Sequence, residues 1–362
     1  MNNNKYIILG LTPQGLSVLR VLGRVGADVT AFCSSPHNVG YHSRYGKKIV
    51  FPDMEALKTG VREIAKEAGM GKPICYICSG DLLAAVLREY KELYDECEVY
   101  SGPFPIIRML AHKDKMYEYA IGRGFKVARY ATLDRAEVSD LRFPLFLKRN
   151  YEIPLFFKAV KVSTPEEYEK YYERIPADSR KDVIAQEFIS IPASDLLNIT
   201  CQGFWVDGKC AGIFVANQKR KLRKGLTAYI EEITDEAFRD KMSKLVCDFM
   251  GELKYQGFAE FEFMYNKKTK ALWFMETNTR PCGTQSALTY KFSNLGDVIL
   301  HPHVFTELQP SPQPVRWMNI QRDIRARLES RDFKNPGDIF RSKYDILDWR
   351  DPLPFIMQFI KL

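Results

Sequence analysis

Hydrophobic and polar positions follow two alternating patterns along roughly the first hundred residues. Most short apolar runs are followed by a stretch in which apolar residues recur every three or four positions. The first pattern is typical of buried strands and the second of amphipathic helices. Strands are expected at 6–9, 29–33, 48–51 and 74–78, and helices at 16–26, at 54–68 and from Ser79-Gly80-Asp81 to Leu93. Strands that alternate with helices predict a parallel sheet covered by helices.

Strands and helices no longer alternate after about residue 110. Helices are expected at 112–124, at 235–254 and from Pro165-Glu166-Glu167, where proline and acids suit a first turn. Strand patterns are found at 143–148, 183–189, 199–206, 210–216 and 257–264. Asp207-Gly208, between two of these strands, is a strong hairpin signal. This part is therefore expected to be α+β with antiparallel strands. About the last sixty residues, to Leu362, show no strong periodicity.

Two turns of the first region bear on ligand binding. The turn from Gly10 to Gly15 lacks the full G-x-G-x-x-G pattern, and no acidic residue ends the second strand, so a dinucleotide site is disfavoured. The two glycines are expected to permit a tight strand-to-helix turn. Ser79, Gly80 and Asp81 follow a strand's carboxyl end, where open parallel sheets bind ligands. Asp81 fits that role and the role of a helix N-cap equally well.

Composition fits a globular protein of two or three lobes. The chain has 362 residues, of which 46% are hydrophobic and 27% charged. No apolar run is long enough to span a bilayer, and the apolar run near the start is too short for a signal peptide. We therefore expect a cytoplasmic protein with no membrane partner. The eight cysteines are scattered; Cys75 and Cys78 would point to opposite faces of a strand, which favours buried free thiols over a redox or metal pair.

The formal net charge of +8 allows two kinds of partner. A basic protein can bind nucleic acid or a membrane surface, or it can bind anionic nucleotides and carboxylates. Basic residues are spread along the chain, with one dense cluster at Lys219–Lys224. No pattern of stacking aromatic residues accompanies them. We expect small anionic ligands and no nucleic acid.

The strongest chemical signal is a pair of apolar strands that carry acids, at 257–264 and 271–280. Glu260 and Glu262 share one face of the first strand, and Glu276, Asn278 and Arg280 share one face of the second if it stays extended. A hairpin would bring Glu262 near Glu276 and Asn278. Carboxylates among apolar residues are costly unless they are paired or bind a metal.

Two carboxylates and an amide are oxygen ligands of the kind that Mg²⁺ prefers. Arg280 would then pair with a transferred phosphate or a substrate carboxylate, which its planar guanidinium fits. The alternative is a solvated sheet face on which these acids form salt bridges with lysines. Lys115, near a helix start, and Lys148, at a strand end, are placed to reach nucleotide phosphates, although a single lysine is more often a surface residue.

The order of these motifs resembles the ATP-grasp superfamily. The motifs are Asp114-Lys115, the strand Phe143 to Lys148, Gln186-Glu187-Phe188-Ile189, Glu262-Phe263, and Glu276-Thr277-Asn278-Thr279-Arg280. The likeness covers about residues 1–300. The tail, with Trp317, Asp323 and Asp351-Pro352, resembles more weakly the carboxylate–amine ligase branch, which includes D-aspartate ligases and carbamoyl-phosphate-synthase-like proteins.

The resemblance implies a fold and a division into domains. The fold would be α/β and α+β: an N-terminal Rossmann-like parallel-sheet domain followed by a two-lobed ATP-grasp fold. The implied domains are an N-terminal domain at 1–108, a small lobe at 109–185, a large lobe with the metal site at 186–305, and a C-terminal extension at 306–362 that packs on the core.

The resemblance also implies a role for each matching residue. ATP phosphates would be held by Lys115 and Lys148. The hinge and adenine site would be Gln186, Glu187, Phe188 and Ile189, and the ribose would bind Asp195. One or two Mg²⁺ ions, or Mn²⁺, would be held by Glu262, Glu276 and Asn278. Arg280 would steady an acyl phosphate, and Lys219 and Arg220 would face the γ-phosphate or the substrate carboxylate.

The implied function is an ADP-forming ligase that joins a small carboxylate, such as an amino acid, to an amine through an acyl phosphate. The loop after Lys148 departs from the family because residues 149–158 contain no glycine, so Lys158 or Lys161 would have to replace backbone contacts to phosphate. The alternatives are a carbamoyl-phosphate-synthase-like enzyme and an ATP-binding regulator without turnover. A homodimer is left open.

Overall fold

The computed structural model describes residues 4–69, 71–151, 155–223 and 225–360. The chain forms two compact units, each built from separate stretches of sequence. The first unit contains residues 1–107, 198–261 and 278–362, and the second contains residues 108–197 and 262–277. Helix α5 (Phe104–Ala111) and strands β13 (Gly257–Asn266) and β14 (Leu272–Asn278) carry the chain from one unit to the other. Among the described residues, no helix has both the length and the hydropathy needed to cross a bilayer.

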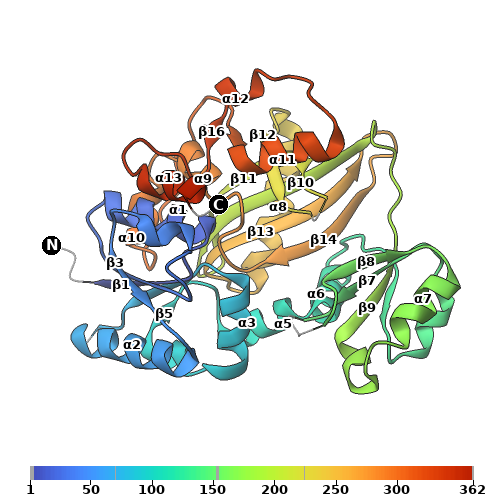
Figure 1. Ribbon diagram of the computed structural model, residues 1–362, viewed down its shortest axis with the longest axis horizontal. Helices are drawn as coiled ribbons and strands as arrows, with labels where there is room; N and C mark the ends of the chain where they lie inside the picture. The colour runs from blue at the N-terminus through green and yellow to red at the C-terminus, as the bar shows by residue number, and fades with distance from the viewer. Residues whose placement is uncertain (1–3, 70, 152–154, 224, 361–362) are drawn as a thin grey trace. The chain divides into compact units, whose positions relative to one another are not determined.

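The first unit begins with a parallel sheet of five strands in the order β3-β2-β1-β4-β5. Its strands are β1 (Lys5–Leu9), β2 (Asp28–Cys33), β3 (Lys47–Val50), β4 (Ile74–Ile77) and β5 (Glu98–Val99). The connecting helices are α1 (Pro13–Arg24), η1 (Val39–His42), α2 (Met54–Glu67), α3 (Gly80–Glu89) and α4 (Leu93–Glu96). Helices α1 and α2 lie on opposite faces of this sheet (Figure 1). The predicted parallel sheet with covering helices is confirmed.

The glycine turn after β1 has the close geometry that its sequence predicts. Gly10 has a φ of +98°, a conformation that strongly favours glycine. A Cβ atom on Gly15 would lie 1.9 Å from the carbonyl oxygen of Gly10, so only glycine fits there. The turn therefore brings the start of α1 directly against the end of β1.

One predicted helix of this region is wrong as a single element. The helix expected from Asp81 to Leu93 is two helices, because α3 ends at Glu89 and α4 begins at Leu93. Tyr90 between them is fully buried and has non-helical backbone angles. Burial of this ring overrides the continuous helical pattern of the sequence.

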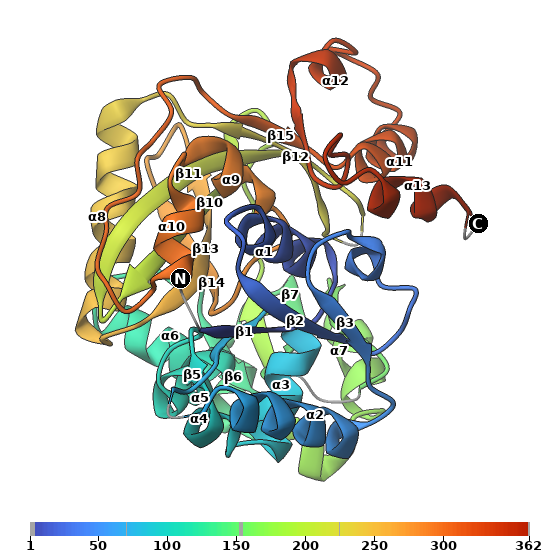
Figure 2. The same ribbon diagram turned by 90° about the vertical axis from the view of Figure 1, so that its left-hand side faces the viewer.

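A larger, mostly antiparallel sheet has the strand order β14-β13-β10-β11-β12-β15-β16. Besides β13 and β14, its strands are β10 (Leu196–Val206), β11 (Lys209–Lys221), β12 (Thr227–Glu232), β15 (Arg316–Met318) and β16 (Lys343–Tyr344). Asp207 and Gly208 both have positive φ, as the predicted two-residue hairpin between β10 and β11 requires. Helix α8 (Glu236–Glu252) packs along β11 (Figure 2), and its N-cap, Asp235, accepts from the Phe238 N–H at 3.0 Å.

The C-terminal region has more regular structure than its sequence pattern suggests. It contains α9 (Ser286–Lys291), α10 (Leu295–Leu300), α11 (Ile320–Ser330), α12 (Asp338–Arg341) and α13 (Leu353–Ile360), besides β15 and β16. Helices α9 and α10 pack against α1, and α11 packs on β12. A buried hydrophobic cluster joins this region to the parallel sheet and includes Tyr6, Tyr76, Phe258, Leu288 and Trp317.

A buried ion pair fixes the end of the chain to the first helix. The Nε atom of Arg20 in α1 donates to the Asp351 carboxylate at 2.9 Å, and its two other nitrogens donate to the backbone oxygens of Ile346 and Asp351. The same carboxylate accepts from the Ser43 hydroxyl at 2.7 Å and the Arg44 N–H at 2.9 Å. Arg20 and Asp351 are 4% and 1% exposed. Each therefore neutralises the charge of the other, which would be uncompensated in the buried environment without its partner.

The second unit contains an antiparallel sheet of four strands in the order β6-β9-β7-β8. The strands are β6 (Tyr130–Thr132), β7 (Leu145–Arg149), β8 (Ala159–Val162) and β9 (Val183–Glu187). The helices are α6 (Lys113–Ile121), η2 (Ala136–Asp140), α7 (Pro165–Tyr172) and η3 (Ala177–Asp182). A separate small core forms beneath α7 from Leu145, Leu147, Val162, Ile175 and Val183. Pro165 occupies the first turn of α7, as predicted.

All eight cysteines are free thiols, as expected, and six of them are buried. Cys75 and Cys78 are fully buried, and burial raises the pKa of the Cys78 thiol far above its ordinary value. Neither thiol is therefore a reactive thiolate at neutral pH.

Candidate functional site

A buried lysine is the centre of the polar cluster in the second unit. Lys148 on β7 is 8% exposed. Its Nζ atom donates to the Tyr117 hydroxyl at 2.6 Å and to Gln186 Oε1 at 2.8 Å. The Tyr117 hydroxyl donates to the Met275 carbonyl at 2.7 Å, and Gln186 Nε2 donates to the Ala128 carbonyl at 3.4 Å. These contacts fix the ammonium group at a single point.

The local sequence explains why these three side chains meet. Strand register pairs Phe146 of β7 with Gln186 of β9, so Gln186 and Lys148 are diagonal neighbours on adjacent strands. Tyr117 lies on the buried side of α6, and its ring centroid is 5.0 Å from Lys148 Nζ. One face of the sheet and one helix thus surround the ammonium.

The electrostatics of this cluster favour an anionic ligand. Burial lowers the pKa of Lys148 to about 8, and the negative charge of Glu276 partly offsets this effect. Lys113 Nζ lies 3.9 Å from the Glu276 carboxylate. A phosphate group beside Lys148 would stabilise the charged ammonium through its negative charge. The present partners, a phenol and an amide, are neutral and do not provide this stabilisation.

Nucleotide binding is therefore expected to take up protons at a pH of about 8.5, because a bound phosphate raises the pKa of Lys148 from about 8. The uptake is measured by titration calorimetry with ADP in buffers of different ionisation enthalpy. Lys148→Met should abolish it, while Lys115→Met, which changes an exposed lysine, should not. Binding of ADP by the unaltered chain without proton uptake would contradict this electrostatic account.

The same shift predicts a stability effect in the free protein. The folded pKa lies below the ordinary value of 10.5, so between about pH 8 and 10.5 the unfolded chain binds more protons than the folded chain. The contribution of Lys148 to the free energy of unfolding therefore increases as the pH rises through this window.

The predicted hinge residues lie at the end of β9. The Glu187 N–H donates to the Arg129 carbonyl at 2.8 Å, and the Phe188 N–H donates to the Pro144 carbonyl at 2.9 Å. The Glu187 carboxylate accepts from the Arg142 N–H at 3.1 Å. These contacts fix the end of β9, whose last residue is Glu187, and Ile189 beyond it is half-buried. The adenine role of this segment stays a prediction.

Three other predicted nucleotide contacts lie nearer the surface. Lys115 is exposed, and its ammonium pairs with Glu118 at 3.1 Å. Lys158 is exposed, and its carbonyl accepts from the Arg149 N–H at 3.3 Å. Asp195 is half-buried, and its carbonyl accepts from the Lys267 N–H at 2.8 Å. Their roles stay predictions. Part of the glycine-free loop, residues 152–154, lies outside the described residues.

In the first unit, a chain of hydrogen bonds leads to the E-x-N-x-R motif. Glu260 on β13 is 5% exposed. One of its oxygens accepts from the Thr200 hydroxyl at 2.8 Å, and the other accepts from Asn278 Nδ2 at 3.1 Å. Arg280 Nη2 donates to Asn278 Oδ1 at 3.2 Å. Asn278 is thus held from both ends of its amide.

Arg280 also lies against the loop that follows β4. A Cβ atom on Gly80 would be 3.1 Å from Arg280 Nε, so glycine leaves room for the guanidinium at this point. Ser79 caps α3, because its hydroxyl accepts from the Leu82 N–H at 3.5 Å. The N-cap role considered for Asp81 is therefore wrong, since Asp81 lies in the first turn. The predicted ligand-binding loop and Arg280 meet within one unit.

The proposed metal ligands are in the predicted strands. Glu262 lies in β13 and Glu276 in β14, and both are half-buried. Strand β14 ends at Asn278, so Arg280 follows the strand rather than belonging to it. No group of three or more His, Cys, Asp and Glu side chains arranged to hold a metal occurs among the described residues. The ligands predicted from sequence are instead two carboxylates and one amide.

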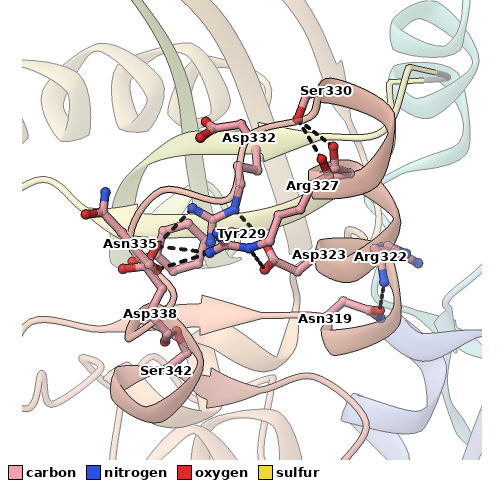
Figure 3. A network of polar contacts seen from close by, with 12 residues as sticks. Tyr229, Asn319, Arg322, Asp323, Arg327, Ser330, Asp332, Asn335, Asp338 and Ser342 are labelled. Atoms are coloured by element: carbon pink, nitrogen blue, oxygen red, sulfur yellow. Dashed lines mark hydrogen bonds and ion pairs between the residues drawn. The ribbon is translucent and has the colours of Figure 1, made fainter.

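The predicted phosphate contacts on β11 have partners within the chain. Arg220 Nε donates to Asp323 at 2.6 Å, and Nη1 donates to Asp338 at 2.9 Å; both aspartates are labelled in Figure 3. Its guanidinium lies 4.1 Å from the Tyr229 ring centroid. Burial lowers the pKa of Arg220, but its bonds to the two carboxylates outweigh this effect and raise the pKa overall. A role in substrate binding stays a prediction and would require Arg220 to bind another anion beside these two carboxylates.

Arg327 completes this network. Its Nε atom donates to Asp323 at 2.7 Å, and Nη2 lies 3.4 Å from Asp338. Asp323 is fully buried, so two arginines and two aspartates join α11 and α12 to the end of β11. Lys219 is exposed, with its ammonium 3.7 Å from Glu231. Lys224, the last residue of the basic cluster, lies outside the described residues.

Sequence reasoning missed Tyr117, Thr200 and the partners of Arg220. A tyrosine or threonine on an apolar element carries no signal of its own, since most such residues belong to the core. Glu260 was recognised only as a neighbour of Glu262 on the same face. Its isolation among apolar residues was the signal that it needs buried partners.

No family model matches the chain, and no curated protein matches it in sequence. Solved structures are nevertheless similar over most of its length. N5-carboxyaminoimidazole synthetase from Staphylococcus aureus in complex with ADP superposes with a TM-score of 0.67 at 12% identity, covering 87% of this chain and 82% of that chain.

Two further solved structures are similar to this chain over most of its length. The Aspergillus clavatus synthase in complex with ADP and 5-aminoimidazole ribonucleotide has a TM-score of 0.66 at 14% identity, covering 88% of this chain and 82% of that chain. The biotin carboxylase domain of Hydrogenobacter thermophilus 2-oxoglutarate carboxylase, with MgADP, ADP and bicarbonate, has a TM-score of 0.66 at 14% identity, covering 85% and 71%. At such low identity the shared property is the fold.

Proposed function

We propose that this chain, which has the ATP-grasp fold, is an ATP-dependent carboxylate–amine ligase that releases ADP and phosphate. The observation that carries the proposal is the buried Lys148 ammonium, which donates to two neutral groups, the Tyr117 hydroxyl and Gln186 Oε1, and is influenced by the charge of Glu276. A buried cation of this kind is costly unless it serves an anion. ATP phosphates are the anions that the fold would bring.

The residues of the E-x-N-x-R motif fit a magnesium ion by the chemistry of their donors. Glu262, Glu276 and Asn278 offer only oxygen atoms, which suit a hard divalent cation. The amide of Asn278 is oriented with its nitrogen toward Glu260, and Oδ1, which accepts from Arg280 at 3.2 Å, would be the atom that contacts a cation. When bound, the ion would neutralise phosphate charge. We propose these three residues as its ligands.

The chain's own groups would act mainly by positioning. Lys148 would hold the phosphates of ATP while an oxygen of the substrate carboxylate attacks the γ-phosphorus and ADP leaves. The amine would then attack the carbonyl carbon of the acyl phosphate, phosphate would leave with the breaking of the C–O bond, and the amine's proton would be lost to solvent. Arg280, whose guanidinium lies beside Gly80, would stabilise the charge of the acyl phosphate. No nucleophilic side chain is required.

The substrates are proposed by chemical class. The acid is a small carboxylate such as an amino acid, and the second substrate is an amine. The solved neighbours are named for complexes with bicarbonate or with 5-aminoimidazole ribonucleotide, so bicarbonate belongs among the acids to be tested here.

A second candidate is a nucleotide-binding regulator without turnover. The observation that favours it is the absence of glycine in residues 149–158, where the small lobe would close over the phosphates. This candidate predicts ATP binding without ADP release for every pair of acid and amine.

The function is tested by ADP and phosphate release in a screen of acids, bicarbonate included, against amines, with the product identified by mass. The ligase predicts release that requires one acid and Mg²⁺ and that is lost in Lys148→Met. ATP binding measured by calorimetry, with no release from any pair, would favour the regulator. Absence of both binding and release would refute both candidates.

A further inference from the structure

The polar cluster around Glu260 contains more than the E-x-N-x-R motif requires. Gln202 Nε2 donates to the Thr284 hydroxyl at 2.6 Å and to the Thr200 hydroxyl at 3.4 Å. The Thr200 hydroxyl in turn donates to Glu260 at 2.8 Å. Gln202, Thr200 and Thr284 are each 2% exposed or less. A buried series of hydrogen bonds therefore runs from α9's N-terminal side to the carboxylate of Glu260.

The series has a direction that is set by the chemistry of Glu260. One of its oxygens accepts from the Thr200 hydroxyl, and the other accepts from Asn278. The group of Asn278 that faces it at 3.1 Å must therefore be the NH₂ group, and the amide oxygen must face the opposite way. Arg280, which can only donate, lies 3.2 Å from that oxygen and agrees with the assignment. Two independent neighbours thus fix the same orientation of the amide.

From this geometry we propose that Glu260 is a positioning residue that sets the Asn278 amide so that Oδ1 faces a divalent cation. Glu260 does not itself bind the cation in this role; both of its oxygens are used by Thr200 and Asn278. Partners of this kind orient metal ligands and raise metal affinity, and their loss weakens binding about 10- to 100-fold. The inference rests on the proposed function, because it assumes that Asn278 binds the cation.

The alternative is a buried acid that contributes only to folding. The two roles differ in what an isosteric change does. Glu260→Gln keeps the size of the side chain but replaces one acceptor with a donor, so it can no longer accept from both Thr200 and Asn278. The Asn278 amide is then oriented by Arg280 alone, so its Oδ1 is fixed less firmly toward the cation. A purely structural role predicts lower stability with unchanged metal affinity.

The test uses Mn²⁺ as the probe, with saturating ADP, and follows free Mn²⁺ by electron paramagnetic resonance. Glu260→Gln is expected to weaken Mn²⁺ binding about tenfold or more while ADP affinity without metal is unchanged. The matched control is Glu232→Gln, which removes another buried carboxylate of the same sheet, 9% exposed and paired with Lys291 at 2.6 Å. Its Mn²⁺ affinity should equal that of the unaltered chain.

A double-mutant cycle tests the positioning role through Mn²⁺ affinities, in a way that a loss of folding stability alone would not reproduce. In an Asn278→Ala background, Glu260→Gln should have no further effect on Mn²⁺ affinity, because Glu260 acts through Asn278. If Glu260→Gln does not fold, Glu260→Asp, which keeps the charge but withdraws both oxygens, should weaken Mn²⁺ binding in the same way.

These outcomes distinguish a failure of the positioning role of Glu260 from a failure of the proposed function. Unchanged Mn²⁺ affinity in Glu260→Gln or Glu260→Asp, with normal binding by the unaltered chain, would overturn the positioning role alone. Additive losses in the cycle would also overturn it. If the unaltered chain bound neither ADP nor Mn²⁺ with ADP, the proposed function would itself fail.

Discussion

Glu276→Ala is expected to lower ATP-dependent ADP release about 10³-fold, an effect typical of removing a group that stabilises transferred charge. Glu276 contributes in two ways. It is a proposed ligand of the magnesium ion, and its charge raises the pKa of Lys148 against the effect of burial. Without it, Lys148 holds its proton less well, so both the metal and the phosphates are bound more weakly. The rate is measured by coupled ADP detection at saturating ATP and Mg²⁺.

The control for this change is Glu169→Gln, which removes an exposed acid on α7 of the same unit. Its rate should stay within about twofold of the unaltered rate, as expected for a surface substitution. Adding Asn278→Ala to Glu276→Ala should leave no measurable release. Release that survives in the double variant would exclude these residues as metal ligands.

Asp351→Ala is expected to lower the free energy of unfolding by about 3–5 kcal/mol, because it leaves a buried arginine without its partner. Arg20 is 4% exposed and donates to this carboxylate at 2.9 Å. The Ser43 hydroxyl and the Arg44 N–H lose their acceptor as well. The measurement is urea unfolding followed by circular dichroism, with linear extrapolation to water.

Asp348→Ala is the matched control. Its carboxylate pairs with the partly exposed Arg24 and lies 4.0 Å from Arg20 Nε, so a loss below about 1 kcal/mol is expected. Replacing both partners, as in Arg20→Met with Asp351→Leu, should recover most of the stability lost in Asp351→Ala. Equal losses for Asp348→Ala and Asp351→Ala would show that burial does not set the strength of this pair.

Elements whose pattern is local could be predicted from sequence. Apolar runs marked the strands of the parallel sheet, and Asp207-Gly208 marked the hairpin between β10 and β11. The pattern also placed Lys148 at the end of an apolar strand, although a single lysine there is more often a surface residue. These signals depend only on neighbours a few residues apart.

Contacts between distant residues could not be predicted in the same way. The partners of Arg220 are 103 and 118 residues away, and Asp351 is 331 residues from Arg20. Helix α11 is mostly polar and gave no clear apolar stripe, since its contact with the sheet depends largely on Asp323 and Arg327, which are charged. Buried ion pairs hide the periodicity on which sequence reasoning relies.

The most direct test of the account is a crystal structure of the chain with Mg²⁺ and a non-hydrolysable ATP analogue. The account predicts that phosphate oxygens contact Lys148 Nζ and that the cation is bound by Glu276 and by Asn278 Oδ1. A nucleotide bound away from Lys148, or a cation without contact to either of these residues, would contradict it.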